Sequence, residues 1–152
     1  MSRRSQTLVA ITAGALALAT SAAEAQTPAG QPKPTASPCP VPDSGFQSCL
    51  RVMYKPGEGD SVEDVRMTAT LLRRVKRCPA RTATRRVTIT GDDGTRLERA
   101  RRPSSCRRGI VSWRSAFSPG ETADWNLRKG DTVHAVWSGV RNAASVEISS
   151  EE

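Results

Sequence analysis

The chain has 152 residues and a formal net charge of +8, with 23 Lys and Arg against 15 Asp and Glu. This length fits one ordinary domain and excludes a multidomain enzyme. Apolar residues make up 37% and aromatic residues only 4%, which predicts a small globular unit with polar flanks rather than a wholly disordered chain.

The N-terminal residues have the three parts of a secretory signal peptide. Arg3 and Arg4 carry positive charge, residues 8–19 are uncharged and apolar, and residues 23–25 form an A-x-A cleavage site. A helix over the apolar run rises only ~18 Å, too short for a hydrocarbon core of ~30 Å. We therefore predict a signal peptide over residues 1–25, secretion to the cell envelope or medium, and a mature chain without a transmembrane segment.

Residues 26–43 are rich in Pro, Thr, Ser and Ala. This composition favours extended, polyproline-like conformers and offers few side chains to bury. We predict a linker or tail over these residues, followed by one domain over residues 44–152.

The chain contains four cysteines, Cys39, Cys49, Cys78 and Cys106. An even number in a chain expected to be exported predicts two disulfides, for which three pairings are possible. The spacings contain no C-x-x-C pair and the only histidine is distant in sequence, which disfavours a zinc site. The midpoint of Cys78 and Cys106 falls on the hairpin turn predicted at residues 92–94, and equidistant residues on antiparallel strands lie opposite each other. We therefore predict Cys78–Cys106, which leaves Cys39–Cys49.

Residues 61–77 allow two interpretations. Their apolar spacing and the capping residue Ser61 fit an amphipathic helix. The strict alternation of apolar and polar residues from Val65 to Leu71 is instead typical of a half-buried strand. Propensity alone leaves both interpretations open.

The following segments have the pattern of short strands separated by turns. Residues 85–102 predict a hairpin that turns at residues 92–94, because Asp-Gly is a preferred tight-turn pair. Residues 109–117 and 131–139 each place Val and Trp on one face, and a short closing strand is predicted at 145–149. Short strands with frequent turns predict an antiparallel β-sandwich.

In chain order, these segments read VRMTATLL, RRVTIT, DDG, GIVSWRSAFSPGE, LRKGDTVHAVWSG and SVEI. Their order resembles that of bacterial immunoglobulin-like domains of the invasin and intimin class, over Asp64 to Ser149. Residues 73–86 depart from that class, which carries a Gly-Pro-Val linker there, and the chain has no internal repeat. The resemblance implies an all-β, immunoglobulin-like antiparallel β-sandwich, here with two disulfides. It also implies a strand over residues 61–77, and it carries no catalytic residues.

The sequence supplies no catalytic constellation that stands out. His134 is the only histidine and lies in a predicted strand, and no G-x-S-x-G motif accompanies it. The acidic pair Asp92 and Asp93 is explained by its turn. We therefore expect a surface or structural histidine and a non-enzymatic protein with no catalytic residue, metal or cofactor.

The chain contains three tryptophans, and exposed tryptophan rings could form a platform that stacks against sugar rings. Trp113 and Trp137 share a strand face with Val or Phe, which predicts that both belong to the core. Trp125 lies between Asp124 and Asn126, so we expect it to be the exposed one.

Positive charge is concentrated in residues 73–108, which hold 13 Lys and Arg against 3 acidic residues. Nearly all are arginines, whose planar fork binds carboxylate and phosphate in bidentate fashion. We predict a polyanion-binding surface, with a solvated basic face as the alternative. The predicted contact residues are Arg73, Arg74, Lys76, Arg77, Arg85, Arg86, Arg99 and Arg101.

These features together predict a secreted, non-enzymatic binding module. Its expected partners are an acidic polysaccharide, a cell-wall polymer or an acidic protein. Nucleic acid is not expected, because the chain is predicted to be exported and has few aromatic residues for stacking. The alternative is a secreted inhibitor of an extracellular hydrolase that inserts Ser118–Thr122 or Arg101–Arg108 into the enzyme's cleft.

Overall fold

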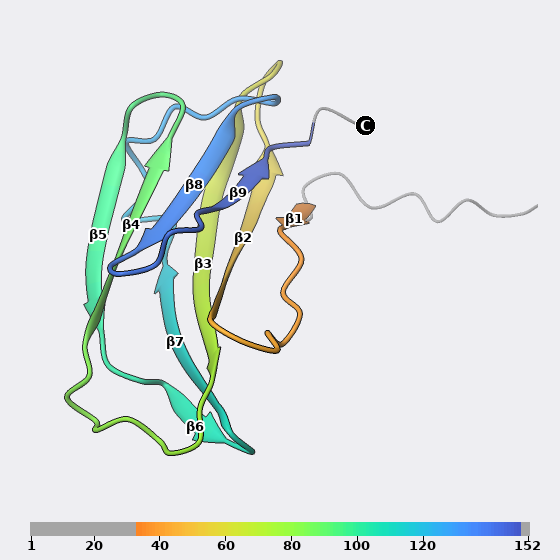
Figure 1. Ribbon diagram of the computed structural model, residues 1–152. Helices are drawn as coiled ribbons and strands as arrows, with labels where there is room; N and C mark the ends of the chain where they lie inside the picture. Colours follow the sequence, from red (N-terminus) through yellow and green to blue (C-terminus); the bar gives the residue numbers. More distant parts are fainter. Residues whose placement is uncertain (1–32, 150–152) are drawn as a thin grey trace, which may run out of the picture.

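The computed structural model of the chain describes residues 33–149. The predicted signal peptide and the first part of the predicted linker, residues 26–32, lie outside the described residues. The described part contains no helix long and apolar enough to span a bilayer. It consists of two packed antiparallel sheets (Figure 1). Their strands are β1 (Lys33–Ala36), β2 (Phe46–Pro56), β3 (Val62–Arg74), β4 (Arg85–Gly91), β5 (Arg96–Arg101), β6 (Ser105–Arg107), β7 (Ile110–Phe117), β8 (Thr132–Trp137) and β9 (Ala144–Glu147).

The strand order is that of an immunoglobulin-like sandwich. One sheet has the order β1-β2-β3-β7-β6 and the other β5-β4-β8-β9. Without β1, the first sheet reads as strands A, B, E and D, and the second reads as C, F and G with β5 added at its edge. The predicted all-β immunoglobulin-like antiparallel β-sandwich with two disulfides is confirmed.

Alternating apolar residues on the inner faces of both sheets form the core. On the inner face of the second sheet, Val87 of β4 pairs with Trp137 of β8 and Ile89 pairs with Ala135, and all four residues are fully buried. Trp113 is also buried, on β7. The predicted burial of Trp113 and Trp137 is thus confirmed.

Residues 61–77 contain β3, which confirms the strand interpretation. A β-bulge explains why part of this segment also has helical spacing. The register with β2 shifts between Met53 and Lys55, and Asp64 adopts a positive φ of 49°. Because the bulge adds one residue to β3, Val62 and Val65 both face the core although they lie three positions apart.

The prediction that Trp125 is exposed is wrong, because its exposed fraction is 8%. The β7–β8 connection folds back over the sandwich and places the ring against Gly91 at the end of β4. A Cβ built on Gly91 would lie 2.9 Å from Trp125 Cζ3. Polar neighbours in sequence did not reveal this contact, because it depends on how a long connection packs.

Both predicted disulfides are confirmed, Cys39–Cys49 and Cys78–Cys106. The hairpin is also present, with β4 and β5 paired up to its open end. However, Cys106 belongs to β6 in the other sheet. The Cys78–Cys106 bridge therefore joins the β3–β4 connection to β6, beyond the open end of the hairpin, instead of crossing the hairpin. The two disulfides are compatible with an extracellular location.

Part of the predicted linker pairs with the domain. β1 is antiparallel to β2, and the Thr35 hydroxyl donates a hydrogen bond of 3.0 Å to the Glu147 carbonyl of β9 in the other sheet. The Cys39–Cys49 bridge holds the following residues against β2. The segment from Lys33 is thus attached to the domain by its pairing with β2, by the Thr35 hydrogen bond to β9 and by the Cys39–Cys49 disulfide.

Candidate functional site

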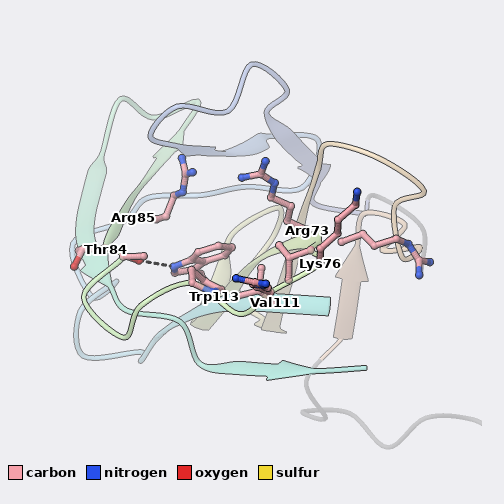
Figure 2. A pocket seen from close by; sticks show the side chains of 11 residues that line it. Arg73, Lys76, Thr84, Arg85, Val111 and Trp113 are labelled. Carbon is pink, nitrogen blue, oxygen red and sulfur yellow. Dashed lines mark hydrogen bonds between the residues drawn. The ribbon is translucent and has the colours of Figure 1, made fainter. Parts of the chain in front are cut away.

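A cavity of about 540 Å³ opens where β3 ends and β4 begins (Figure 2). Its floor includes Val111 and Trp113, two buried residues on the inner face of β7. Five of the eight predicted polyanion-binding residues line it, namely Arg73, Arg74, Lys76, Arg77 and Arg85. The fold therefore brings together the two basic clusters that flank residues 78–84 in the sequence.

The connection between β3 and β4, which carries Lys76 and Arg77, is held in place by three different bonds. The Val75 amide donates a hydrogen bond of 2.8 Å to the Gly109 carbonyl. Cys78 is joined to β6 by its disulfide. The indole nitrogen of Trp113 donates a hydrogen bond of 2.9 Å to the Ala83 carbonyl. These bonds fix the path of the chain around the cavity.

An aromatic ring supports two of the guanidinium groups. Arg73 Cζ lies 4.7 Å and Arg85 Cζ 4.6 Å from the ring centroid of Phe46. Arg85 Cζ also lies 5.6 Å from the Trp113 ring, and its Nη1 donates a hydrogen bond of 2.7 Å to the Ser138 carbonyl. Cation–π contacts of this kind hold a guanidinium group while leaving its N–H edge open.

Phe46 was not identified from the sequence. It is the first residue of β2, far in sequence from the basic clusters. A single partly buried Phe at the start of a strand carries no local signal of a site. Only the register, which pairs Phe46 with Arg73, and the packing of the second sheet reveal its position.

The cavity cations make no ion pair with a carboxylate among residues 33–149. The ion pairs of the described residues involve other cations. Arg74 donates a hydrogen bond of 3.3 Å from Nε to the Pro42 carbonyl, and the nearby Asp43 lines a neighbouring hollow with Arg73 and Arg74. Within residues 33–149, the positive charge of the cavity is thus not compensated by an ion pair.

The three remaining predicted contact residues do not line the cavity. Arg86 lies 3.6 Å from a carboxylate oxygen of Glu98. Arg99 forms an ion pair with Glu121, and its Cζ lies 4.5 Å from the ring centroid of Phe117. Burial, with a smaller contribution from Arg101, lowers the pKa of Arg99. Arg101 contacts Ser115 Oγ at 3.4 Å. The structure therefore divides the predicted set into five residues at the cavity and three elsewhere.

Charge is also separated along the sandwich. The connections at residues 75–84, 102–104 and 108–109 lie at one end, low in Figure 1, and hold five basic and no acidic residues. We call this the basic end. The connections at residues 57–61 and 92–95, and the long one that ends at β8, lie at the opposite end and are rich in Asp and Glu. Such a distribution gives the basic end a positive electrostatic potential relative to the opposite end.

His134 lies on the surface, as predicted. Its Nδ1 is 2.7 Å from Ser145 Oγ on the neighbouring strand. Its Nε2 is 4.0 Å from a carboxylate oxygen of Asp92. All three side chains lie on the outer side of the sheet. None of them lines one of the cavities found in the described residues.

The two loops considered for insertion into an enzyme are held close to the domain. In Ser118–Thr122, Thr122 is buried and its hydroxyl donates a hydrogen bond of 2.6 Å to the Val65 carbonyl. Arg101–Arg108 includes β6, which pairs with β7, and Cys106 of the disulfide. Neither loop is an extended segment standing away from the sandwich.

Comparison with known proteins assigns no relative to the chain. No family model, no curated protein and no solved structure matches it.

Proposed function

We propose that this protein is an exported, non-enzymatic binding module that holds an acidic cell-envelope polymer or an acidic protein at its basic end. One observation carries the proposal. Five cationic residues line a single cavity, and none of them forms an ion pair within the described residues. Gathering like charges without counter-charges is unfavourable, so an external anion is the group that would balance them.

The cavity residues have complementary roles in this proposal. The guanidinium forks of Arg73 and Arg85 bind oxyanions in bidentate fashion, whereas Lys76 acts as a mobile point charge. Arg74 and Arg77 extend the positive surface beside them. Binding releases counterions from the polymer and makes or breaks no covalent bond.

Two further features support export. The N-terminal residues have a signal-peptide pattern, and the described residues hold two disulfides. We further propose the relation to the invasin and intimin class on the order of the sequence segments, and the strand order supports only the immunoglobulin-like fold within it. That relation concerns the fold and adds no ligand.

Salt-dependent retention on heparin, used as a generic polyanion, tests the proposal. The test variant replaces Arg73, Arg74, Lys76 and Arg77 with Ser. A matched control removes the same charge by replacing four exposed arginines outside the cavity with Ser, namely Arg51, Arg66, Arg114 and Arg128. We expect the oxidised parent to be retained until the salt concentration is raised, and the test variant to elute well before the control.

The outcomes separate the functions considered. Each cation that no longer neutralises an anionic group of the polymer lowers the slope of log affinity against log salt by ~0.9. The cavity variant should therefore show a shallower slope than the control. Equal elution of the two variants would contradict a discrete site. The cavity cations would then be interpreted as a solvated basic face. A stoichiometric, salt-insensitive complex with an extracellular hydrolase would favour the inhibitor function instead. If the parent is retained on heparin and the cavity variant elutes earlier than the control, binding to cell-wall fractions would narrow the class of polymer that the protein binds.

A further inference from the structure

We propose that Phe46, Arg73 and Arg85 form a clamp for two neighbouring oxyanions on one polymer chain, with Phe46 as the positioning residue. The inference rests on the proposed function and names the ligand pattern that the cavity prefers. The shared ligand chemistry is a linear chain with phosphate or carboxylate groups on successive units.

The clamp is built across the two sheets. Phe46 and Arg73 are directly paired residues of β2 and β3. Arg85 begins β4 in the other sheet, yet its guanidinium lies over the same ring. Since both Cζ atoms lie within 4.7 Å of one ring centroid, their separation cannot exceed the sum of the two distances. The sandwich therefore holds the two guanidinium carbons at most 9.3 Å apart.

The ring also restricts the motion of both arginines before any ligand binds. A free arginine side chain loses rotamer freedom when it grips an anion. Stacking on Phe46, and for Arg85 the additional bond to Ser138, removes part of this freedom in advance. Figure 2 shows Arg73 and Arg85 on neighbouring sides of the cavity above Trp113. Preorganisation of this kind increases affinity without adding charge.

The arrangement selects for paired anions. Each guanidinium offers its own N–H edge, so one oxyanion satisfies one fork and leaves the other unpaired. The apolar face of Phe46 supplies no donor to an anion beside it. A chain whose neighbouring anions engage both forks gains the second interaction at high effective concentration.

Affinity for short and long anions tests the clamp. The probes are inorganic phosphate against tripolyphosphate, and galacturonate against tri-galacturonate, which distinguish phosphate from carboxylate chains. We expect the parent to bind at least one trimer ~10-fold or more tightly than its monomer. Phe46→Leu should lower trimer affinity about threefold to tenfold and leave the salt slope unchanged, because the ring is lost and no charge is removed. Phe46→Tyr keeps the ring and should restore affinity.

Two further variants separate positioning from charge and from folding. Arg73→Lys/Arg85→Lys keeps both charges and the ring but removes the forks, so it should lose the preference for trimers. Arg107→Gln removes an exposed charge of β6 outside the cavity. It should keep both the salt slope and the trimer-to-monomer ratio, because Arg107 does not line the cavity.

The outcomes distinguish the clamp from the proposed function. A parent that binds no polyanion overturns both. A parent whose trimer preference survives in Phe46→Leu and in the double lysine variant overturns the clamp alone. If Phe46→Tyr loses affinity as much as Phe46→Leu, at equal thermal stability, the aromatic contact is not the positioning element and the clamp is overturned.

Discussion

Removal of the Cys78–Cys106 disulfide tests how the basic connection between β3 and β4 is held. This bridge has a sequence separation of 28, against 10 for Cys39–Cys49. In the chain-entropy relation, cross-linking stabilises the folded protein by restricting the unfolded chain, more so for longer loops. The relation gives about 3.6 kcal/mol for the longer loop and about 2.7 kcal/mol for the shorter one at 25 °C.

We therefore expect Cys78→Ser/Cys106→Ser to lower the free energy of unfolding by about 3.6 kcal/mol. For a domain of this size, the midpoint of thermal unfolding should fall by ~10–20 °C. Urea unfolding followed by tryptophan fluorescence, without reductant, measures the loss, with Cys39→Ser/Cys49→Ser as the comparison. A larger loss in the comparison variant, or no loss in either, would refute the loop-entropy reasoning.

The same variant has a defined effect on the candidate site. Val75 and Ala83 keep their hydrogen bonds to Gly109 and Trp113, so the connection stays attached at two of its three points. The cations are retained, but Lys76 and Arg77 gain freedom when Cys78 is released. We expect weaker retention on heparin with little change in the salt slope, because the number of charges is the same.

Three further predictions concern pH and packing. Burial acts to raise the pKa of Asp93, but hydrogen bonds donated by Thr95 and a backbone amide outweigh it and hold the pKa below its usual value. The stability that ionised Asp93 contributes is therefore present above pH ~4 and lost as the pH falls below that value. Asp93→Asn should reduce the fall of the urea unfolding midpoint as the pH is lowered below ~4. Burial raises the pKa of Tyr54, the only tyrosine, so stability should decline above pH ~10 and phenolate absorbance should appear together with unfolding. Gly91→Ala places a Cβ 2.9 Å from Trp125 Cζ3 and should cost about 1–3 kcal/mol in urea unfolding; an unchanged midpoint would show that the ring can move aside.

The sequence was sufficient for features that depend on a few neighbouring residues. Alternation in β4 and the Asp-Gly turn predicted the hairpin, because side-chain period and turn chemistry are local properties. The even cysteine count and the symmetry about that turn predicted the pairing of both disulfides, although Cys106 lies in β6 of the other sheet and the bridge does not cross the hairpin. The segment at residues 61–77 shows the limit of such reasoning. A bulge at Asp64 produced a helix-like spacing inside a strand, and that irregularity depends on pairing with β2.

The basic character of residues 73–108 is likewise a property of the sequence by itself, as is the preference of their arginines for oxyanions. Which of those cations act together was decided only by the tertiary structure. Arg85 reaches the cavity from the second sheet, and Phe46 of β2 contacts Arg73 and Arg85. Arg99 is instead engaged by Glu121 and Phe117. Trp125 was buried by the packing of a long connection. The physical reason is the same in each case. Local patterns are encoded within a few residues, whereas contacts between the sheets are set by packing among segments far apart in the chain.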